Sequence, residues 1–199
     1  MAGTAPAWRT SNIAYNAGQL WGKLAIPGAG ARITLDADGT PDATANASAF
    51  HYGATKSGSK LMIKSAMLNQ NVDEFRAPIT TAVDTVSMGI SCELVGITEL
   101  DVIENLLPGV ATAAAASGYE QIRVGTAPIV YQSVALIFPL REDATKYGIF
   151  NVYSALNDSG VEWAQSRKEL GFTPANFVGY EITSRAATDT LGSFWKQVA

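Results

Sequence analysis

The sequence predicts a mainly β domain, a β-sandwich or barrel with one flanking α-helix and extended N- and C-terminal arms. Several short segments alternate apolar and polar residues with a period of two, which is typical of strands that bury one face. Only one segment has the three-to-four-residue spacing of an amphipathic helix. The two ends of the chain carry isolated aromatic residues among small ones, so we expect them to dock on another surface.

These observations divide the 199 residues into three parts. Residues 1–18 are the N-terminal arm, residues 19–185 the folded domain, and residues 186–199 the C-terminal arm. Hydrophobic residues make up 47% of the chain, enough for a sizeable core. Charged residues make up only 16%, against roughly 25% in a typical soluble domain. A surface with so little charge indicates that part of it is buried against other copies of the chain.

The clearest strand signal lies in residues 85–95. Apolar residues at the even positions 86–94 predict a side that faces the core. The other side carries small or polar residues with one charge, and it would form a smooth, wetted surface or an ordinary exposed strand face. These residues are Thr85, Ser87, Gly89, Ser91 and Glu93.

Other segments predict further strands. Residues 128–139 are apolar on both faces, which indicates a central strand or one at a subunit contact. The turn residues 157–160 predict a hairpin between strands 148–156 and 161–167. Residues 111–118 lack an anchoring apolar stripe, so we expect a loop or a frayed helix. The remaining strand predictions are residues 31–36, 60–68 and, as the last strand, 177–184.

The helix is predicted at residues 98–107. Thr98 is a suitable N-cap, and Glu99 and Asp101 lie in the first turn, where the helix dipole favours acidic side chains. Pro108 and Gly109 end the helix. Its apolar side consists of Leu100, Ile103, Leu106 and Leu107.

Composition excludes several functional classes. A net charge of −4 supplies no basic field that would attract nucleic acid. A single cysteine and a single histidine exclude an internal disulfide and a Cys/His zinc site. No apolar run approaches the roughly 18 residues of a membrane span. The first residues lack the regions of a signal peptide, so we expect assembly in the cytoplasm.

No combination of residues predicts catalysis. His51 lies between two aromatic residues, which favours a packed ring over a general base. Cys92 falls on the apolar side of its strand and is expected in the core. Gly28 and Gly30 lack the third glycine of a dinucleotide-binding turn. We therefore predict no catalytic residue, no cofactor and no metal site.

Two groups of residues are candidates for contacts between subunits. The loop 69–83 carries a charged cluster typical of a salt-bridged contact. The arms carry large aromatic residues, which often anchor interfaces. The candidates are Asp73, Glu74, Phe75 and Arg76 in the loop, and Trp8, Phe194 and Trp195 in the arms.

The order of these elements resembles that of a bacteriophage major tail protein, the tail-tube subunit of long-tailed phages. An arm and a hairpin region precede a charged loop that ends at Pro78; an alternating strand, the run Thr-Glu-Leu-Asp and a short helix follow. The likeness covers about residue 19 to the end, most clearly residues 60–107 and 161–198. It rests on pattern rather than on invariant residues, so it transfers no functional residue.

The resemblance implies a fold similar to the tube proteins of type VI secretion systems. Such subunits usually form hexameric rings whose inner strands close a β-barrel, and the rings stack into a hollow tube that conducts DNA. Residues 85–95 and 59–68 would then line the lumen, and loop 69–83 would contact the next ring. Lys60 and Lys64 alternate opposite to Leu61 and Ile63, so a lumenal strand here would place lysines where a mildly acidic wall is expected.

The implied partners are other copies of the chain, tail tip or baseplate and terminator proteins, a tape-measure protein in the lumen, and passing DNA that is not specifically bound. No membrane partner is expected, and the protein would reside in the virion tail. Three alternatives stay open. They are a β-sandwich binding module for carbohydrate or a host surface, another virion component such as a capsid decoration or tail terminator protein, and a small hydrolase built around His51.

Overall fold

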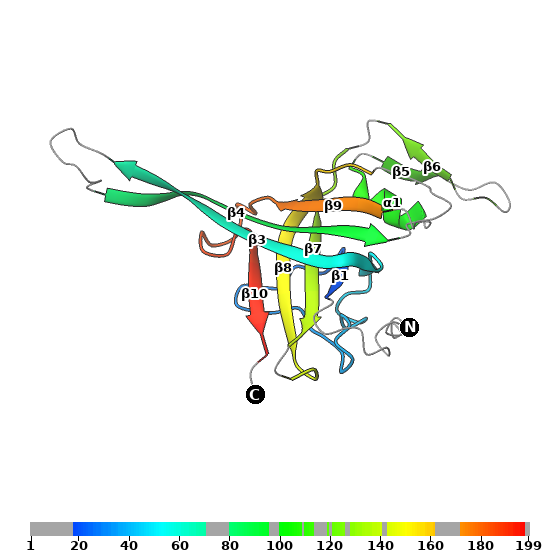
Figure 1. Cartoon of the computed structure of the whole chain (residues 1–199), viewed down its shortest axis with the longest axis horizontal. Coiled ribbons are helices and arrows are strands. Elements are labelled where there is room, and N and C mark those ends of the chain that lie inside the picture. The colour runs from blue at the N-terminus through cyan, green and yellow to red at the C-terminus, as the bar shows by residue number, and fades with distance from the viewer. Residues whose placement is uncertain are drawn as a thin grey trace.

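The computed structural model describes residues 18–70, 80–95, 100–108, 110–113, 119, 121–125, 128–140, 143–161 and 172–197. Within these residues the fold is mainly β, as predicted, with one helix (Figure 1). The elements are β1 (Gln19–Gly22), β2 (Phe50–His51), β3 (Thr55–Gln70), β4 (Thr80–Val95), α1 (Leu100–Leu106), β5 (Val110–Ala113), β6 (Gln121–Val124), β7 (Gln132–Pro139), β8 (Tyr147–Asn157), β9 (Phe172–Gly179) and β10 (Gly192–Lys196).

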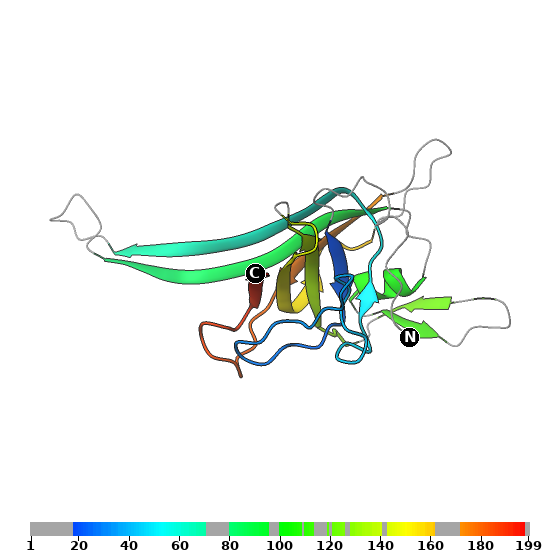
Figure 2. The same ribbon diagram turned by 90° about the horizontal axis from the view of Figure 1, so that it is seen from below.

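One large antiparallel sheet contains eight of these strands, in the order β2-β1-β7-β8-β9-β4-β3, with β10 paired to β8 beside this path. The sheet branches at β8 because one edge of this strand serves two partners. Residues 148–152 pair with β10, and residues 155–157 pair with β9. The sheet bends there, so that β3, β4 and β9 lie across β7 and β8 (Figures 1 and 2).

The main core fills the space between these two parts of the sheet. The even-numbered residues 88–94 of β4 are buried, which confirms the predicted alternation for this part of the strand, whereas Val86, also predicted to face the core, is 44% exposed. Val102, Ile103 and Leu106 of α1 close the core at one end. The sheet residues that meet in this core include Met88, Ile90, Cys92, Leu94, Val134, Leu136, Phe150, Val152 and Phe177.

The second face of β7 is covered as well. Leu24 and Ile33, from the segment that follows β1, pack against Ala135, Ile137 and Ile149. Five consecutive residues of β7, 133–137, are therefore buried. This confirms the central strand that two-sided apolarity predicted, although the strand begins at Gln132 rather than at residue 128.

The helix is confirmed at Leu100–Leu106, and Leu107 donates a backbone hydrogen bond to the carbonyl of Ile103. Leu100, Leu107 and the three buried residues of α1 all contact the core, as the apolar spacing predicted. The predicted N-cap, Thr98, lies outside the described residues.

Two local predictions are wrong. Residues 31–36 form only an isolated bridge between Leu35 and Pro41, although Ile33 is buried. Residues 111–113, expected as a loop or frayed helix, belong to β5 because β6 supplies an antiparallel partner. Pairing with a neighbouring strand thus overrides the helix propensity of alanine.

The C-terminal third also differs from the prediction. β9 spans Phe172–Gly179 rather than 177–184. Pro174 is tolerated within it because the nitrogen and carbonyl of a residue in an extended strand point to the same edge, and the Pro174 carbonyl accepts from the Ser159 turn, so no pairing with β4 needs the N–H that proline lacks. The last strand is β10, which lies inside the expected C-terminal arm and pairs with β8. The second half of the predicted hairpin, 162–167, lies outside the described residues.

β3 and β4 are longer than the predicted strands, with sixteen residues each, and they pair from Thr55–Leu94 to Gln70–Thr80. Only residues 89–95 of β4 also pair with β9. The rest of β4, residues 80–88, pairs only with residues 63–70 of β3. These two segments project from the body as a two-stranded ribbon (Figures 1 and 2). A bulge at residue 84 interrupts it, since Ala66 pairs with Thr85 and Met67 pairs with Val83.

A buried asparagine joins four elements at the end of β8. The Asn157 amide donates to the carbonyls of Leu106 (3.0 Å) and Gly160 (3.2 Å). Its side-chain oxygen accepts from the backbone N–H of Asn176 (2.7 Å) and from the Ser159 hydroxyl (2.8 Å). The side chain therefore ties the helix end and the following turn to β9.

We predict that Asn157→Ala lowers the free energy of unfolding by about 2–4 kcal/mol, because the buried Leu106 carbonyl loses its donor and the Asn176 N–H keeps only the Ser159 hydroxyl as acceptor. Urea unfolding followed by circular dichroism measures this change. Gln121→Ala, at an exposed amide on β6, should change stability by no more than about 0.5 kcal/mol. Equal stability of the two variants would contradict the role assigned to Asn157.

Candidate assembly surfaces

The strand register gathers the predicted polar residues of β4 on one side of the sheet. Thr85, Ser87 and Glu93 are exposed and Ser91 is half-buried, whereas the even-numbered neighbours 88–94 face the core. Asn176 of β9 lies opposite Ser91, and directly paired residues share a face. We call this surface, away from the core, the polar face.

The two lysines of β3 lie on this polar face. Lys60 pairs with Ser91 and Lys64 pairs with Ser87, while Met62 between them pairs with Gly89. Both lysines are exposed. The register thus answers the question that the sequence left open, namely which residues of β3 accompany the hydroxyl-bearing residues of β4. On the described strands β3, β4 and β9, this face carries two lysines and Glu93 rather than an acidic surface.

Gly89 lies in the middle of the polar face and is buried there. A Cβ atom at this position would approach the carbonyl oxygen of Phe177 to 2.7 Å, so β4 and β9 could not keep their spacing with a larger residue. The absent side chain contributes to a depression of about 500 Å³, whose lining includes Lys60, Lys64, Asn176 and Val178.

The opposite face of the ribbon carries four large apolar side chains besides Ser65, and no described element covers them. Ile63 and Val86 continue the core-facing side of β3 and β4, and the bulge at residue 84 brings Val83 onto the same side as Met67. We call these four residues the apolar stripe. Their exposed fractions are 63% for Ile63, 61% for Met67, 59% for Val83 and 44% for Val86. This stripe was not predicted from the sequence, although Ile63 and Met67 already alternate opposite to the lysines.

The edge of β3 is also uncovered. β3 is the last strand in the order of the large sheet, and in the part of the chain that is described no strand pairs with its outer edge. An edge strand of this length presents a row of backbone donors and acceptors to any strand that approaches.

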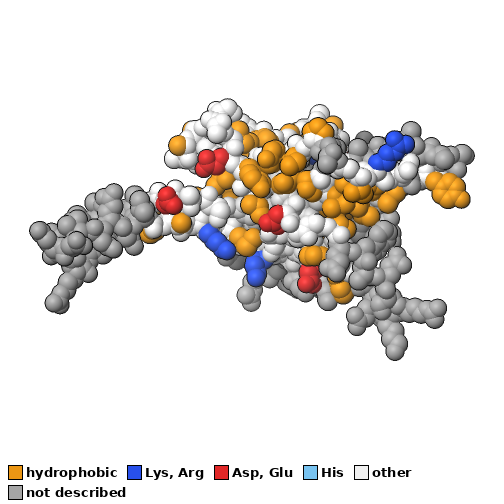
Figure 3. Space-filling model, turned by 90° about the horizontal axis from the view of Figure 1, so that it is seen from above, with side chains coloured by type: hydrophobic (Ala, Val, Ile, Leu, Met, Phe, Trp, Pro, Cys, Tyr) orange, Lys and Arg blue, Asp and Glu red, His pale blue; other side chains and the backbone are white. Residues whose placement is uncertain are grey.

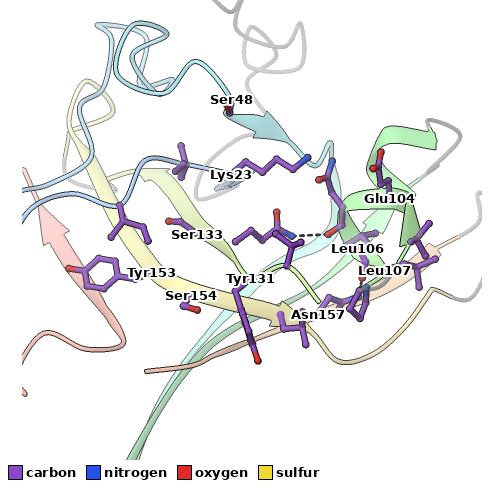
Figure 4. A pocket seen from close by; sticks show the side chains of 18 of the residues that line it. Lys23, Ser48, Glu104, Leu106, Leu107, Tyr131, Ser133, Tyr153, Ser154 and Asn157 are labelled. Atoms are coloured by element: carbon purple, nitrogen blue, oxygen red, sulfur yellow. Dashed lines mark hydrogen bonds between the residues drawn. The ribbon is translucent and has the colours of Figure 1, made fainter. Parts of the chain in front are cut away.

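A hollow of about 630 Å³ lies elsewhere on the body, between α1, the start of β7 and the residues after β1 (Figure 4). Lys23 reaches across it toward α1, where Glu104 also lines it. Gln132 donates a hydrogen bond to the carbonyl of Asn105 at 2.8 Å, and the hydroxyl of Ser133 donates to the amide oxygen of Asn151 at 3.0 Å. These polar groups are held by amides and carbonyls, and none of the contacts described pairs a nucleophile with a base.

Exposed apolar residues border this hollow. Val130 and Tyr131 line it and are 76% and 49% exposed, and the adjoining Ile129 is 56% exposed. The rings of Tyr131 and Tyr180 lie 5.1 Å apart. We call Ile129, Val130, Tyr131 and Tyr180 the rim. Figure 3 shows hydrophobic side chains gathered over the middle of the face of the molecule that is seen from above.

The histidine and the cysteine are both packed. The His51 ring lies 4.8 Å from that of Trp21, and its Nδ1 accepts the N–H of Gly53. Burial raises the pKa of the Cys92 thiol from 9.0 to about 12, so the thiol stays protonated at neutral pH. The prediction that Cys92 lies in the core is confirmed. Neither residue lines the hollow or the depression on the polar face.

The predicted contact residues divide into two groups. Phe194 and Trp195 lie in β10, where Phe194 is 55% exposed and near the rings of Phe138 and Phe150. Trp195 packs on the opposite side, beside Ile149 and Ile137. The predictions for Trp8, Asp73, Glu74, Phe75 and Arg76 lie outside the described residues.

Neither a metal site nor a similar known protein adds to this geometry. Among the described residues, no group of three or more His, Cys, Asp or Glu side chains could hold a metal ion. The described helix, α1, falls short of what a membrane span requires. No family model matches the chain, and no curated protein is significantly similar to it.

We predict that Gly89→Ala lowers the free energy of unfolding by about 1–3 kcal/mol, because the new methyl group forces β4 away from β9. The matched control is Ser87→Ala on the same face, where β9 does not pair, with an expected change below about 0.5 kcal/mol. Thermal and urea unfolding of both variants measure the difference. A Gly89→Ala variant as stable as the wild type would show that β4 and β9 accommodate the added methyl group without moving apart.

Proposed function

We propose that this chain is a structural, non-catalytic subunit that assembles with copies of itself into rings. The resemblance implies that these rings are hexameric, and they would stack into the hollow tail tube of a bacteriophage. DNA would pass through this tube into the host. On this proposal the bent sheet is the subunit's β-sandwich or barrel, of the kind that tail tubes share with type VI secretion tubes.

The observation that carries the proposal is the exposed ribbon with its uncovered edge. Folded monomers usually shorten, charge or cover such an edge, because it would otherwise pair with other chains. Here β3 runs for sixteen residues as the outermost strand of its sheet. An edge of this kind supports a role in which strands of neighbouring subunits join into one continuous sheet.

The residues of the polar face support a position on the lumen wall, but they change the charge expected for that wall. Ser87, Ser91 and Thr85 supply a hydroxyl-bearing surface to which passing DNA would adhere weakly. Lys60 and Lys64 attract phosphates, but they are single ammonium groups four residues apart, or roughly 13 Å along a strand. The proposed wall is therefore nearly neutral on its described residues, rather than acidic as the sequence suggested.

In a phage tail, the proposed tube would have further partners. A tube of this kind would contact tail tip or baseplate and terminator proteins at its ends and a tape-measure protein in its lumen. One feature favours the alternative of a binding module: the hollow of about 630 Å³ is bordered by Tyr131, and aromatic residues beside a hollow are common in ligand sites.

Negative-stain electron microscopy of the purified protein at rising concentration tests the proposal directly. We expect hollow tubes or stacked rings with a central channel. Dispersed particles at every concentration, also after a tail initiator complex is added, would overturn the proposal and favour a binding module. Discrete rings that never stack would favour a terminator or decoration protein instead.

The charged loop provides a second test. We expect Arg76→Glu to prevent stacking while the monomer keeps its fold, because a reversed charge at a contact between subunits repels its partner. Electron microscopy reports the assembly and circular dichroism reports the fold. Arg123→Glu makes the same change at an exposed position on β6 and should leave assembly intact. Long tubes from Arg76→Glu would show that the loop does not form the contact.

A further inference from the structure

We propose that the depression on the polar face binds a single phosphate group, held between Lys60 and Lys64 above Gly89. The ligand is a free phosphate, a phosphate monoester or one phosphodiester unit of a nucleic acid, all of which present phosphate oxygens to the same donors. All residues of the site belong to one chain, so the site does not require the proposed assembly.

The depression gathers hydrogen-bond donors from two strands. Lys60 and Lys64 line it from β3, and Ser87 and Ser91 line it from β4. Each lysine lies directly opposite one of the two serines, so an ammonium group and a hydroxyl group share each end of the depression. Phosphate oxygens accept hydrogen bonds from both kinds of group, and the ammonium groups also attract their charge.

These donors have no competing partner in the part of the chain that is described. Neither lysine forms an ion pair there, and neither serine hydroxyl forms a hydrogen bond. None of the side chains that line the depression is acidic. An arriving anion would therefore displace water alone, without separating an existing pair of charges.

Gly89 lies midway between the two ends and leaves room for the ligand. A glycine inside a strand often marks a place where a ligand approaches the backbone closely. The lysine Cα atoms are roughly 13 Å apart along the strand, and the flexible four-carbon stems let both ammonium groups lean toward the middle. Met62 and Val178 flank Gly89 on the neighbouring strands, and they provide apolar contacts for a group esterified to the phosphate.

Acidic residues beyond the depression limit the site to one phosphate group. Glu93 lies two residues past Ser91 on the polar face, and the carboxylate of Asp158 accepts a hydrogen bond from the Asn176 amide at 2.6 Å. Past the other end, Asp84 occupies the bulge of β4. These carboxylates would repel the next phosphates of a long polyanion. Binding is therefore local and weak, which is compatible with a face along which DNA passes.

Isothermal titration calorimetry of the full chain with inorganic phosphate tests the site. We expect saturable binding with a dissociation constant on the order of 1 mM or below. Lys60→Gln and Lys64→Gln should each raise this constant roughly tenfold, and Ser87→Ala and Ser91→Ala should each raise it about threefold to fivefold. The matched control is Lys23→Gln, which removes an exposed lysine that lines the other hollow and should leave binding unchanged.

A short oligothymidylate distinguishes the two sources of the phosphate group. If it competes with inorganic phosphate and depends on the same two lysines, the site accepts a phosphodiester of nucleic acid. If inorganic phosphate binds and the oligonucleotide does not, the site takes a free phosphate or a phosphate monoester. Both results support the site, and each names its ligand.

Two results would overturn this site. Binding that does not saturate, or that Lys23→Gln weakens as much as Lys60→Gln does, would show a diffuse attraction to positive charge. Circular dichroism establishes that each variant folds. Electron microscopy of the same wild-type protein keeps the two proposals apart: tubes without phosphate binding leave only the proposed function standing, and phosphate binding without tubes leaves only the phosphate site.

Discussion

The contact between Met88 and the branch in β8 is the constraint on which the rest of the fold depends. Met88 packs beside Gly192 of β10, where even a Cβ atom would lie 2.6 Å from its sulfur, and Val152 of β8 belongs to the same core. β8 passes from β10 to β9 at this point, so the sheet has to turn. Once it turns, β4 can cover β8 only over half its own length, and the remainder must leave the body as the ribbon.

Local periodicity predicted the elements whose two sides differ in environment. The even residues 88–94 meet the core and their odd neighbours do not, so the pattern in the sequence is clear. Residues 133–137 of β7 are buried on both sides, and uniform apolarity predicted this equally well. In both cases the signal arises because burial acts on each residue separately.

Elements that depend on distant partners could not be predicted in this way. β10 exists because part of one β8 edge is available, and nothing within residues 192–196 encodes that fact. Residues 80–84 of β4 were missed because the bulge at residue 84 shifts the alternation from even to odd positions. The hollow brings together Lys23, Glu104, Tyr131 and Asn157 from four separate segments, so it leaves no local pattern.

The exposed strand edge and the apolar stripe relate the low charge of the chain to its structure. A protein with 16% charged residues can remain folded alone, but it has few charged side chains with which to protect a long strand edge or a projecting apolar stripe. Edges and stripes of this kind are kept from indiscriminate aggregation either by charge or by an ordered partner. The described ribbon has only Lys64 and Asp84 as charged residues, and both its edge and its stripe point away from the body. A partner of fixed geometry is therefore the simpler protection, and on the proposed self-assembly identical copies would supply it.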